Sequence, residues 1–366
     1  MMPVCTPPVC SKPLRLGFLA LTDAAPFVVA HELGHFAQNG LRVELRREIG
    51  WATIREKIIY GDLDAAPAPA PMVWSAQLGH GCLATEVLTA LVINRHGNAL
   101  TLSRALWDEG VRDASSLRDF ACTRRNRQLL TVGVVFPFSS HHLLLRDWLR
   151  TAGLEPDRDV RIVIVPPAQM FRNLVAGTID GFCAGEPWNS LAVREGAGWC
   201  PTWSAAQQPG HFEKVLLVTR RFAEGRFAEH AALVRALTAA AAWCDEPGNR
   251  PRLAELLADS LYLNIPARVI APALLGHFDC GNGRIESVPD FHVFHRAGAG
   301  IPSVAQATTL QNALGAAGLL SPAQAADSTL PRRLFREDLH REILTNQASH
   351  ELTSSSDLRG AGSALR

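Results

Sequence analysis

Residues 14–45, LRLGFLALTDAAPFVVAHELGHFAQNGLRVEL, carry the pattern that decides the fold. Leu14–Leu19 is predicted to form a short buried strand, and Ala24–Gln38 has the apolar spacing of a helix. Leu41–Leu45 alternates as a second strand, and a second helix is expected over Trp51–Tyr60. Because strands and helices alternate, this stretch predicts a parallel α/β sheet.

The same order of elements starts again in the middle of the chain. Leu130–Phe136 is strand-like, His141–Ala152 is helical, and Val160–Val165 is another strand. In each half the second helix leads into a Gly-x-x-Asp turn, which is Gly61-Asp62-Leu63-Asp64 in the first half and Gly177-Thr178-Ile179-Asp180 in the second. Two similar lobes explain this symmetry better than a short solenoid repeat.

The fold class expected from these patterns is a two-lobed α/β clamp, each lobe a mostly parallel sheet flanked by helices. A chain of 366 residues is long enough for two such lobes. We place lobe I at residues 14–106 plus 212–326 and lobe II at residues 107–211. Residues 1–13 are expected to form a flexible leader, and residues 327–366 a flexible, charged tail.

The composition excludes several classes of function. Hydrophobic residues make up 47% of the chain and charged residues 19%, which predicts a large buried core. The 36 basic and 35 acidic residues give a net charge of +1, so we expect no basic face for direct nucleic-acid binding. No apolar run approaches the roughly twenty residues that span a bilayer, so the chain is not expected to be membrane-spanning.

The N-terminus and the cysteines bear on location. The first twelve residues, MMPVCTPPVCSK, contain no basic n-region followed by an apolar h-region. We therefore expect a cytoplasmic location, whereas a start site assigned too far downstream would indicate the periplasm. The eight cysteines include no C-x-x-C pair and are expected to be reduced in the cytoplasm. The alternative to reduced cysteines is a redox or metal-binding pair formed by Cys5 and Cys10. No cofactor is expected.

One motif suggests an enzyme. His31-Glu32-Leu33-Gly34-His35 matches H-E-x-x-H, in which two histidines on one helix face bind zinc and the glutamate acts as a base. The helix is expected to end at Asn39-Gly40, and no third-ligand motif follows. The simpler interpretation is an exposed face of the first helix, and a zinc hydrolase is kept as a remote alternative. Since G-x-S-x-G, P-loop and G-x-G-x-x-G fingerprints do not occur, we predict a protein that is not an enzyme.

Four other positions have a possible role in anion binding. His141 opens a helix after Ser139-Ser140, where free N–H groups and the helix dipole favour an anion. Gly185 permits close approach of the backbone to a ligand, Trp51 offers a flat wall, and Lys214 offers a positive charge. Taken one at a time, the simpler interpretations are a surface histidine, an ordinary turn, a core tryptophan and a surface lysine.

Seven ordered blocks together resemble the nitrate-binding proteins of bacterial ABC transporters and their bicarbonate-binding relatives. Three of them read LGFLALTDAAP (16–26), WATIREK (51–57) and DGFCAGEPWN (180–189). The other four are Gly61–Ala66, His96–Leu102, Phe136–His141 and Pro166–Met170. The resemblance implies a periplasmic-binding-protein-like (type II) clamp that closes on a ligand between its lobes.

The resemblance also implies a pocket for nitrate built from six positions: Trp51, Asn98, His141, Pro167, Gly185 and Lys214. The tryptophan forms a wall and the proline lines the pocket. The asparagine, the histidine and the glycine N–H donate hydrogen bonds, and the lysine carries the counter-charge. Asn98 departs from the family pattern, where we expect a longer glutamine in many relatives. Lys214 is placed only by its position before the Val215 strand.

Lys214 is the position that discriminates between ligands. The resemblance implies that bicarbonate-binding relatives have an acidic residue there and recruit a metal. A buried monovalent anion needs a compensating charge, so a lysine favours nitrate or nitrite and predicts a site without metal.

Two biological roles follow from the resemblance. The first is that of the cytoplasmic nitrate/nitrite sensors (NasS-like), in which nitrate regulates nitrate assimilation through an RNA-binding antiterminator partner. The alternative is the substrate-binding component of a nitrate ABC transporter, with the transporter's membrane components as partners. A thiamine-precursor enzyme on the same fold is a weaker alternative, because no catalytic cysteine or histidine cluster supports it.

Overall fold

The first strand forms where the sequence predicts it, whereas the helix predicted over Ala24–Gln38 is broken at Gly34 into two helices. The computed structural model describes residues 12–124 and 129–345. β1 (Leu14–Phe18) pairs in parallel with β2 (Val43–Arg47). β1 is the more buried strand because its leucines and phenylalanine face the core, whereas β2 alternates with half-exposed polar residues.

The second sheet of lobe I is antiparallel and has the order β14-β5-β11-β3, with β4 paired to the end of β11. Its strands are β3 (Ala66–Pro69), β4 (Val87–Leu88), β5 (Val92–His96), β11 (Phe212–Thr219) and β14 (His292–Val293). A bridge between Leu16 and Ala65 links β1 to the chain that enters β3.

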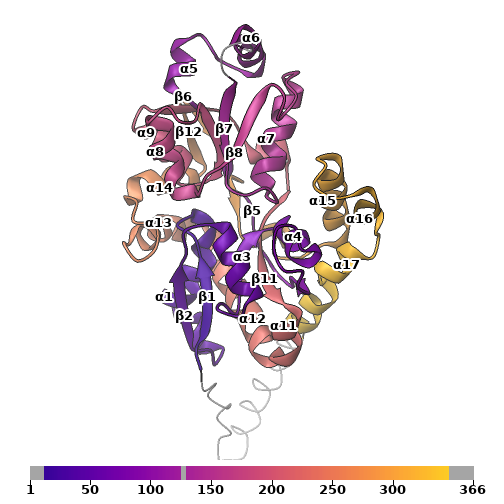
Figure 1. The fold of residues 1–366 in the computed structure, drawn as a ribbon. Helices are drawn as coiled ribbons and strands as arrows, with labels where there is room; N and C mark the ends of the chain where they lie inside the picture. The colour runs from indigo at the N-terminus through magenta and orange to yellow at the C-terminus, as the bar shows by residue number, and fades with distance from the viewer. Residues whose placement is uncertain (1–11, 125–128, 346–366) are drawn as a thin grey trace, which may run out of the picture.

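Lobe II is built on one five-stranded sheet of order β10-β6-β9-β7-β8. Its strands are β6 (Asn98–Ser103), β7 (Leu130–Val134), β8 (Val160–Ile164), β9 (Gly181–Gly185) and β10 (Gly198–Trp203). β7 runs parallel to both β8 and β9, while β6 is antiparallel to β9 and β10. In Figure 1 this lobe is the upper body and lobe I the lower one.

The two-lobed α/β class is confirmed, but the sheets are not mostly parallel: lobe II has a mixed sheet, and lobe I has a parallel pair beside an antiparallel sheet. The predicted strand–helix units are parallel, as their crossovers require. The antiparallel strands come from the segments that pass between the lobes, where no helical crossover precedes the pairing. The lobe boundary also moves: β6 at Asn98–Ser103 belongs to lobe II, so the chain crosses at His96-Gly97 and not near residue 106.

Helices cover both lobes. Those of lobe I before the first crossing are α1 (Ala25–Glu32), α2 (His35–Gln38), α3 (Trp51–Ile59) and α4 (Met72–Leu78), with a short 3-10 turn η1 (Thr22–Ala24). Those of lobe II are α5 (Arg104–Asp108), α6 (Ala114–Arg124), α7 (Ser140–Thr151), η2 (Pro167–Gln169), α8 (Met170–Val175), α9 (Trp188–Arg194) and α10 (Ser204–Gln207).

The aspartates of the two Gly-x-x-Asp turns make equivalent hydrogen bonds in the two lobes. The Asp64 carboxylate accepts a 2.8 Å hydrogen bond from the backbone N–H of Arg15, at the second position of β1. The Asp180 carboxylate accepts a 2.8 Å bond from the N–H of Thr131, at the second position of β7. The equivalence is structural: each aspartate ties the turn to the first strand of its unit.

At β11 the chain is back in lobe I, and further on it contacts lobe II again. The returning elements are α11 (Arg220–Gly225), α12 (Phe227–Asp245), η3 (Pro247–Asn249), α13 (Arg250–Ala258) and α14 (Ala267–Leu274). α12 packs on α1 in the core of lobe I. The hairpin β12 (His277–Gly281) and β13 (Arg284–Ser287) packs against β10 and α9 of lobe II, with Phe278 and Cys280 buried beside Cys200.

The C-terminal part that the structure describes is packed, not free. η4 (Arg296–Gly298), α15 (Val304–Ala316), α16 (Pro322–Ala326) and α17 (Leu330–Leu334) lead to a helical stretch at residues 337–345. Leu334 and Phe335 are fully buried, and Leu339 and Ile343 nearly so. The expectation of a flexible tail from residue 327 is therefore wrong up to residue 345, because this stretch supplies apolar side chains to lobe I. The expected leader before residue 12 and the last part of the tail, 346–366, lie outside the described residues, as do Cys5 and Cys10.

The lobes meet through a shared apolar cluster. It includes Leu21 and Trp51 of lobe I together with Phe136, Phe182 and Trp188 of lobe II. This packing brings the ends of β1, β6, β9 and β11 together at the interface. Across the described residues, no helix combines the length and apolarity needed to pass through a bilayer.

Candidate functional site

Five of the six predicted site residues lie in one buried place between the lobes. They are Trp51 at the start of α3, Asn98 at the start of β6, His141 in the first turn of α7, Gly185 at the end of β9 and Lys214 on β11. Their side chains, where they have one, are at most 1% exposed. Elements from both lobes contribute, so the arrangement depends on the closed position of the lobes.

Lys214 is the centre of the cluster. Its Nζ lies 2.8 Å from Oδ2 of Asp23, forms a hydrogen bond with Oε1 of Glu213, and lies 5.3 Å from the centre of the Trp51 ring. Burial alone would lower the pKa of Lys214, but the two neighbouring carboxylates raise it above its usual value. The lysine is therefore charged, with the electron-rich face of the indole beside it.

Glu213 is the residue to which the donors of the cluster converge. Its Oε2 accepts hydrogen bonds from Asn98 Nδ2 and Ser140 Oγ, and its Oε1 lies 3.5 Å from His141 Nε2. Although burial would raise its pKa, the charge of Lys214 lowers it well below the usual value. A carboxylate of lobe I is thus held ionised chiefly by Lys214 of the same lobe, and it also accepts hydrogen bonds from Asn98 and Ser140 of lobe II.

A β-bulge lets two successive residues of β11 reach the same site. Neighbouring strand residues ordinarily point to opposite faces of a sheet. The pairing of β11 with β5 shifts register on both sides of Lys214, between Phe212 and Lys214 and again before Val215. Bulges re-aim side chains in this way, and here Glu213 and Lys214 meet at their tips.

His141 is a neutral histidine. Burial lowers its pKa to about 3, and neither ring nitrogen has a hydrogen-bond partner in the described part of the chain. Ser139 caps α7, since its Oγ accepts a 3.2 Å bond from the N–H of His142. This cap fixes the turn that carries Ser140 and His141.

Asn98 and Gly185 face one another on neighbouring antiparallel strands. A Cβ atom on Gly185 would lie 3.1 Å from Asp23 Oδ2 and 3.4 Å from Asn98 Oδ1. A side chain there would press on the Asp23 carboxylate of the other lobe, which would have to shift by a few tenths of an ångström. Asn98 Oδ1 has no partner within the described ranges.

Two buried acids beside the cluster were missed by the sequence reasoning. Asp23 follows β1, and its Oδ1 accepts a 2.8 Å bond from Asn94; burial raises its pKa to about 6. Glu186 follows β9, and burial raises its pKa to about 7. Both stand just after the carboxyl end of a strand, the edge at which α/β sheets bind ligands, so their position was a usable signal.

Pro167 lies at the mouth of the cleft and not among the five. It lines a cavity of about 560 Å³ whose walls come from both lobes, including Ala20 and Ile49 on one side and Trp188 on the other. A second cavity, of about 390 Å³, reaches the cluster at Ser140 and is lined by His211 and, on one side, by α15.

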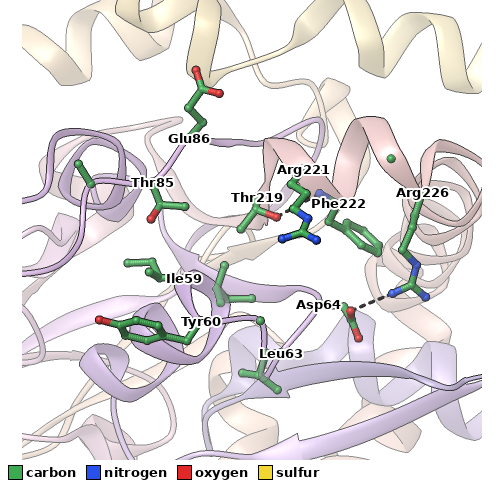
Figure 2. Close-up of a pocket in the computed structure, with 14 residues that line it drawn as sticks. Ile59, Tyr60, Leu63, Asp64, Thr85, Glu86, Thr219, Arg221, Phe222 and Arg226 are labelled. Atoms are coloured by element: carbon green, nitrogen blue, oxygen red, sulfur yellow. Dashed lines mark hydrogen bonds and ion pairs between the residues drawn. The ribbon is translucent and has the colours of Figure 1, made fainter.

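The largest cavity described, about 840 Å³, lies elsewhere, in lobe I between α3 and α11 (Figure 2). None of the six predicted residues lines it. Asp64 at its edge is paired with Arg226 at 3.0 Å, and Tyr60 beside it is largely exposed. Its lining residues come from lobe I, whereas the five predicted residues meet between the lobes. We therefore place the candidate site at the Lys214 cluster.

The zinc interpretation of HELGH is wrong. α1 ends at Glu32, and Gly34 has a left-handed backbone (φ 75°) that separates it from α2, which begins at His35. The two histidines are consequently not on one helix face. His31 Nδ1 lies 3.2 Å from the hydroxyl of Tyr262, which donates to Glu32. Among the described residues, no group of three or more His, Cys, Asp or Glu side chains could hold a metal.

Together, the two lobes and their sheets define a periplasmic-binding-protein-like fold, with the cluster between the lobes. The model of the NMT1-like family matches residues 9–258, and the chain belongs to that family. The crystal structure of the periplasmic nitrate-binding protein NrtA from Synechocystis is similar at a TM-score of 0.87 and 27% identity, covering 91% of this chain and 88% of that one.

Curated relatives extend the similarity. The nitrate/nitrite binding protein NrtA of Synechococcus elongatus is 30% identical over 95% of this chain and 81% of its own length. The nitrate import ATP-binding protein NrtC of Synechocystis sp. is 39% identical over 79% of this chain and 44% of its own length. The bicarbonate transport ATP-binding protein CmpC of Synechococcus elongatus is 40% identical over 70% of this chain and 39% of its own length. The chain thus spans less than half the length of the ATP-binding relatives.

Proposed function

We propose that this chain binds nitrate or nitrite at the Lys214 cluster and acts as the substrate-binding component of a nitrate-type ABC transporter. The observation that carries the proposal is the convergence of Trp51, Asn98, His141, Gly185 and Lys214 between the lobes of a chain similar to NrtA. Binding proteins among its relatives accord with a role in binding and not in catalysis.

The chemistry of the cluster suits a small planar anion. The ammonium of Lys214 supplies the charge that a buried anion needs. The amide of Asn98 and the hydroxyl of Ser140 are donors that already serve a carboxylate, and the indole of Trp51 is a flat wall. A neutral His141 can donate from one ring nitrogen without adding charge.

Because Glu213 lies beside Lys214, the lysine alone does not decide between nitrate and bicarbonate. An acidic residue and a lysine occupy adjacent positions of the same bulge, and the relatives include bicarbonate proteins. The decisive experiment is calorimetric titration of the purified, metal-stripped protein with nitrate, nitrite and bicarbonate, each with and without calcium. Metal-independent binding of nitrate or nitrite supports the proposal. Binding of bicarbonate alone, and only with calcium, would overturn it.

A cytoplasmic nitrate/nitrite sensor with an antiterminator partner is the second candidate. It is favoured by one observation: identity is higher to parts of ATP-binding proteins, 39% and 40%, than to the free-standing NrtA, 30%. This chain has no P-loop, so the shared part is not the nucleotide-binding motif. A binding module joined to an ATP-binding protein has access to the compartment that holds ATP, as a sensor requires.

The two roles are separated by their partners. A sensor would bind an RNA-binding antiterminator protein in size-exclusion chromatography and release it when nitrate is added. A transporter component would bind the membrane components of the transporter in detergent or nanodiscs and would not bind the antiterminator. Retention of the antiterminator at saturating nitrate would contradict the sensor role.

A further inference from the structure

The Glu213 carboxylate has the surroundings of a bound oxyanion. One oxygen accepts from Asn98 and Ser140, both from lobe II, and the other accepts from Lys214 and faces His141 at 3.5 Å. The side chain has no exposed surface. Three of these four partners, Asn98, His141 and Lys214, are groups that the predicted pocket would offer to nitrate, and the fourth, Ser140, is the neighbour of His141.

A carboxylate and a nitrate ion present the same recognition problem. Both are flat, carry one negative charge, and accept hydrogen bonds at oxygens that lie in the plane of the group. Donors placed for one are therefore suitably placed for the other. The family resemblance assigns no role to Glu213, and strand alternation would turn it away from the site.

We propose that the Glu213 carboxylate is an internal ligand of the oxyanion site, and that an external oxyanion binds by displacing it from Asn98, Ser140 and Lys214. This inference rests on the proposed oxyanion binding at the cluster and specifies how that binding is regulated.

Charge balance requires the displacement. Lys214 is already shared between Glu213 and Asp23, at 2.8 Å from the latter. An external anion added to this buried group would face two fixed carboxylates and only one cation. An unpaired buried charge is costly. When Glu213 withdraws, Lys214 stays paired with Asp23 alone, and an external anion then takes the place of the displaced carboxylate without adding a net charge beside the lysine.

The structure offers a place for the displaced carboxylate. His211 Nε2 lies 3.4 Å from Oε2 of Glu213, on the segment just before β11. His211 and Ser140 both line the cavity of about 390 Å³ under α15. Rotation of the Glu213 side chain toward this cavity would keep it beside a histidine donor and clear the space in front of Lys214.

The test compares wild-type protein with Glu213→Gln and Glu213→Ala by calorimetry, using nitrate and formate as probes. Formate is the free form of the group that Glu213 supplies. We expect nitrate to bind Glu213→Gln at least tenfold more tightly than wild type. We expect Glu213→Ala to bind formate at least tenfold more tightly than wild type, in competition with nitrate, because formate replaces the missing carboxylate.

Glu48→Gln is the matched control. Glu48 is another poorly exposed carboxylate of lobe I paired with a lysine, at 2.8 Å from Lys57, and it lines the cavity of about 560 Å³ and not the Lys214 cluster. It should not gain affinity for formate. Thermal unfolding of every variant, with and without nitrate, establishes that each one is folded.

The outcomes distinguish a failure of the internal-ligand proposal from a failure of the proposed oxyanion site. If wild type binds nitrate or nitrite but both Glu213 variants bind it equally or more weakly and gain no formate binding, the internal ligand is refuted and the proposed function stands. If neither wild type nor any folded variant binds nitrate, nitrite or formate, the site assignment fails and this inference fails with it.

Discussion

Lys214 is a buried cation whose charge is balanced inside the chain, and this decides what its removal would do. Two carboxylates face its ammonium, Asp23 from lobe I's first turn and Glu213 from the preceding position. Without the lysine these two acids would repel each other in a low-dielectric site. The residue is therefore both a ligand-binding candidate and a structural counter-charge, and only a binding measurement separates the two roles.

The variant Lys214→Ala should lose roughly 2–5 kcal/mol of nitrate binding energy, about 30-fold to several thousand-fold in Kd, the penalty for removing one partner of a buried charge pair. Calorimetry on folded protein measures it. Lys57→Ala, which removes a half-exposed lysine paired with Glu48, is the control and should leave the affinity unchanged. Equal affinity in Lys214→Ala and wild type would remove Lys214 from the site.

His230 gives a pH prediction that is independent of the ligand. It is fully buried in α12 beside Phe222, and burial lowers its pKa to about 4. Between pH 6.5 and 4 the unfolded chain binds a proton that the folded chain refuses, so stability falls as the pH falls through this window. The contribution of this one residue approaches about 3 kcal/mol.

His230→Leu should flatten that dependence. We expect the difference in unfolding free energy between variant and wild type to shift in favour of the variant by about 2–3 kcal/mol between pH 7 and pH 4. Urea unfolding at a series of pH values measures it. The other buried histidines are the same in both proteins, so their effect cancels. If the unfolding free energies of variant and wild type change with pH in parallel, the pKa of His230 is not lowered in the folded protein.

At the scale of elements, the N-terminus of α7 positions the lobe II side of the site. Ser139 Oγ accepts from the N–H of His142 at 3.2 Å and donates to the carbonyl of Phe136 at 2.6 Å. Ser139→Ala should cost about 1–2 kcal/mol of stability. It should also weaken nitrate binding, because Ser140 and His141 occupy the turn that the cap holds.

Ser321 provides the comparison for that prediction. It caps α16 in a capping box far along the chain from the cluster. Ser321→Ala should lose a similar stability, about 1 kcal/mol, and keep the nitrate affinity of wild type. Chemical unfolding and calorimetry on both variants test the pair. If both lose affinity equally, the effect of Ser139 is general destabilisation and not positioning.

The elements that could be predicted from the sequence are those with a regular period. β1, α3, β7, α7 and β8 fall where strand and helix patterns place them, because burial of one face imposes that period. The break at Gly34 and the bulge at Lys214 were missed, since a single left-handed residue or one extra strand residue leaves the composition unchanged. Glu213 was missed for the same reason: alternation assigns it to the face opposite Lys214.

The C-terminal segment was misjudged because its apolar residues are few and separated by charges. Phe335 is fully buried, stacked on Phe212 at 5.7 Å and close to Trp74 at 5.2 Å, so one ring closes the core beside β11. Phe335→Ala should cost about 3–5 kcal/mol of stability. Phe227→Ala, at a residue 41% exposed, should cost below about 1 kcal/mol. If urea unfolding showed similar losses of stability for Phe335→Ala and Phe227→Ala, this packing of Phe335 would be contradicted.

At the scale of the whole molecule, polar contacts close the lobes on one another. The N–H of Thr22 donates to the carbonyl of Glu186 at 2.8 Å, and the Trp188 indole donates to the carbonyl of Ala20 at 3.1 Å. Glu213 adds the charged contact, since it belongs to lobe I and is bound by Asn98 and Ser140 of lobe II. An internal carboxylate can therefore hold the clamp closed as a ligand would.

This gives a prediction about shape that binding measurements do not test. Without nitrate, Glu213→Ala should have a larger radius of gyration in small-angle scattering than wild type, because the charged interlobe contact is gone. Added nitrate should contract the variant, while wild type should change little, since nitrate there replaces one bridging anion with another. Glu48→Gln should scatter like wild type. Equal contraction of wild type and Glu213→Ala would mean that the lobes of wild type open freely until an external anion arrives, and that Glu213 does not bridge them.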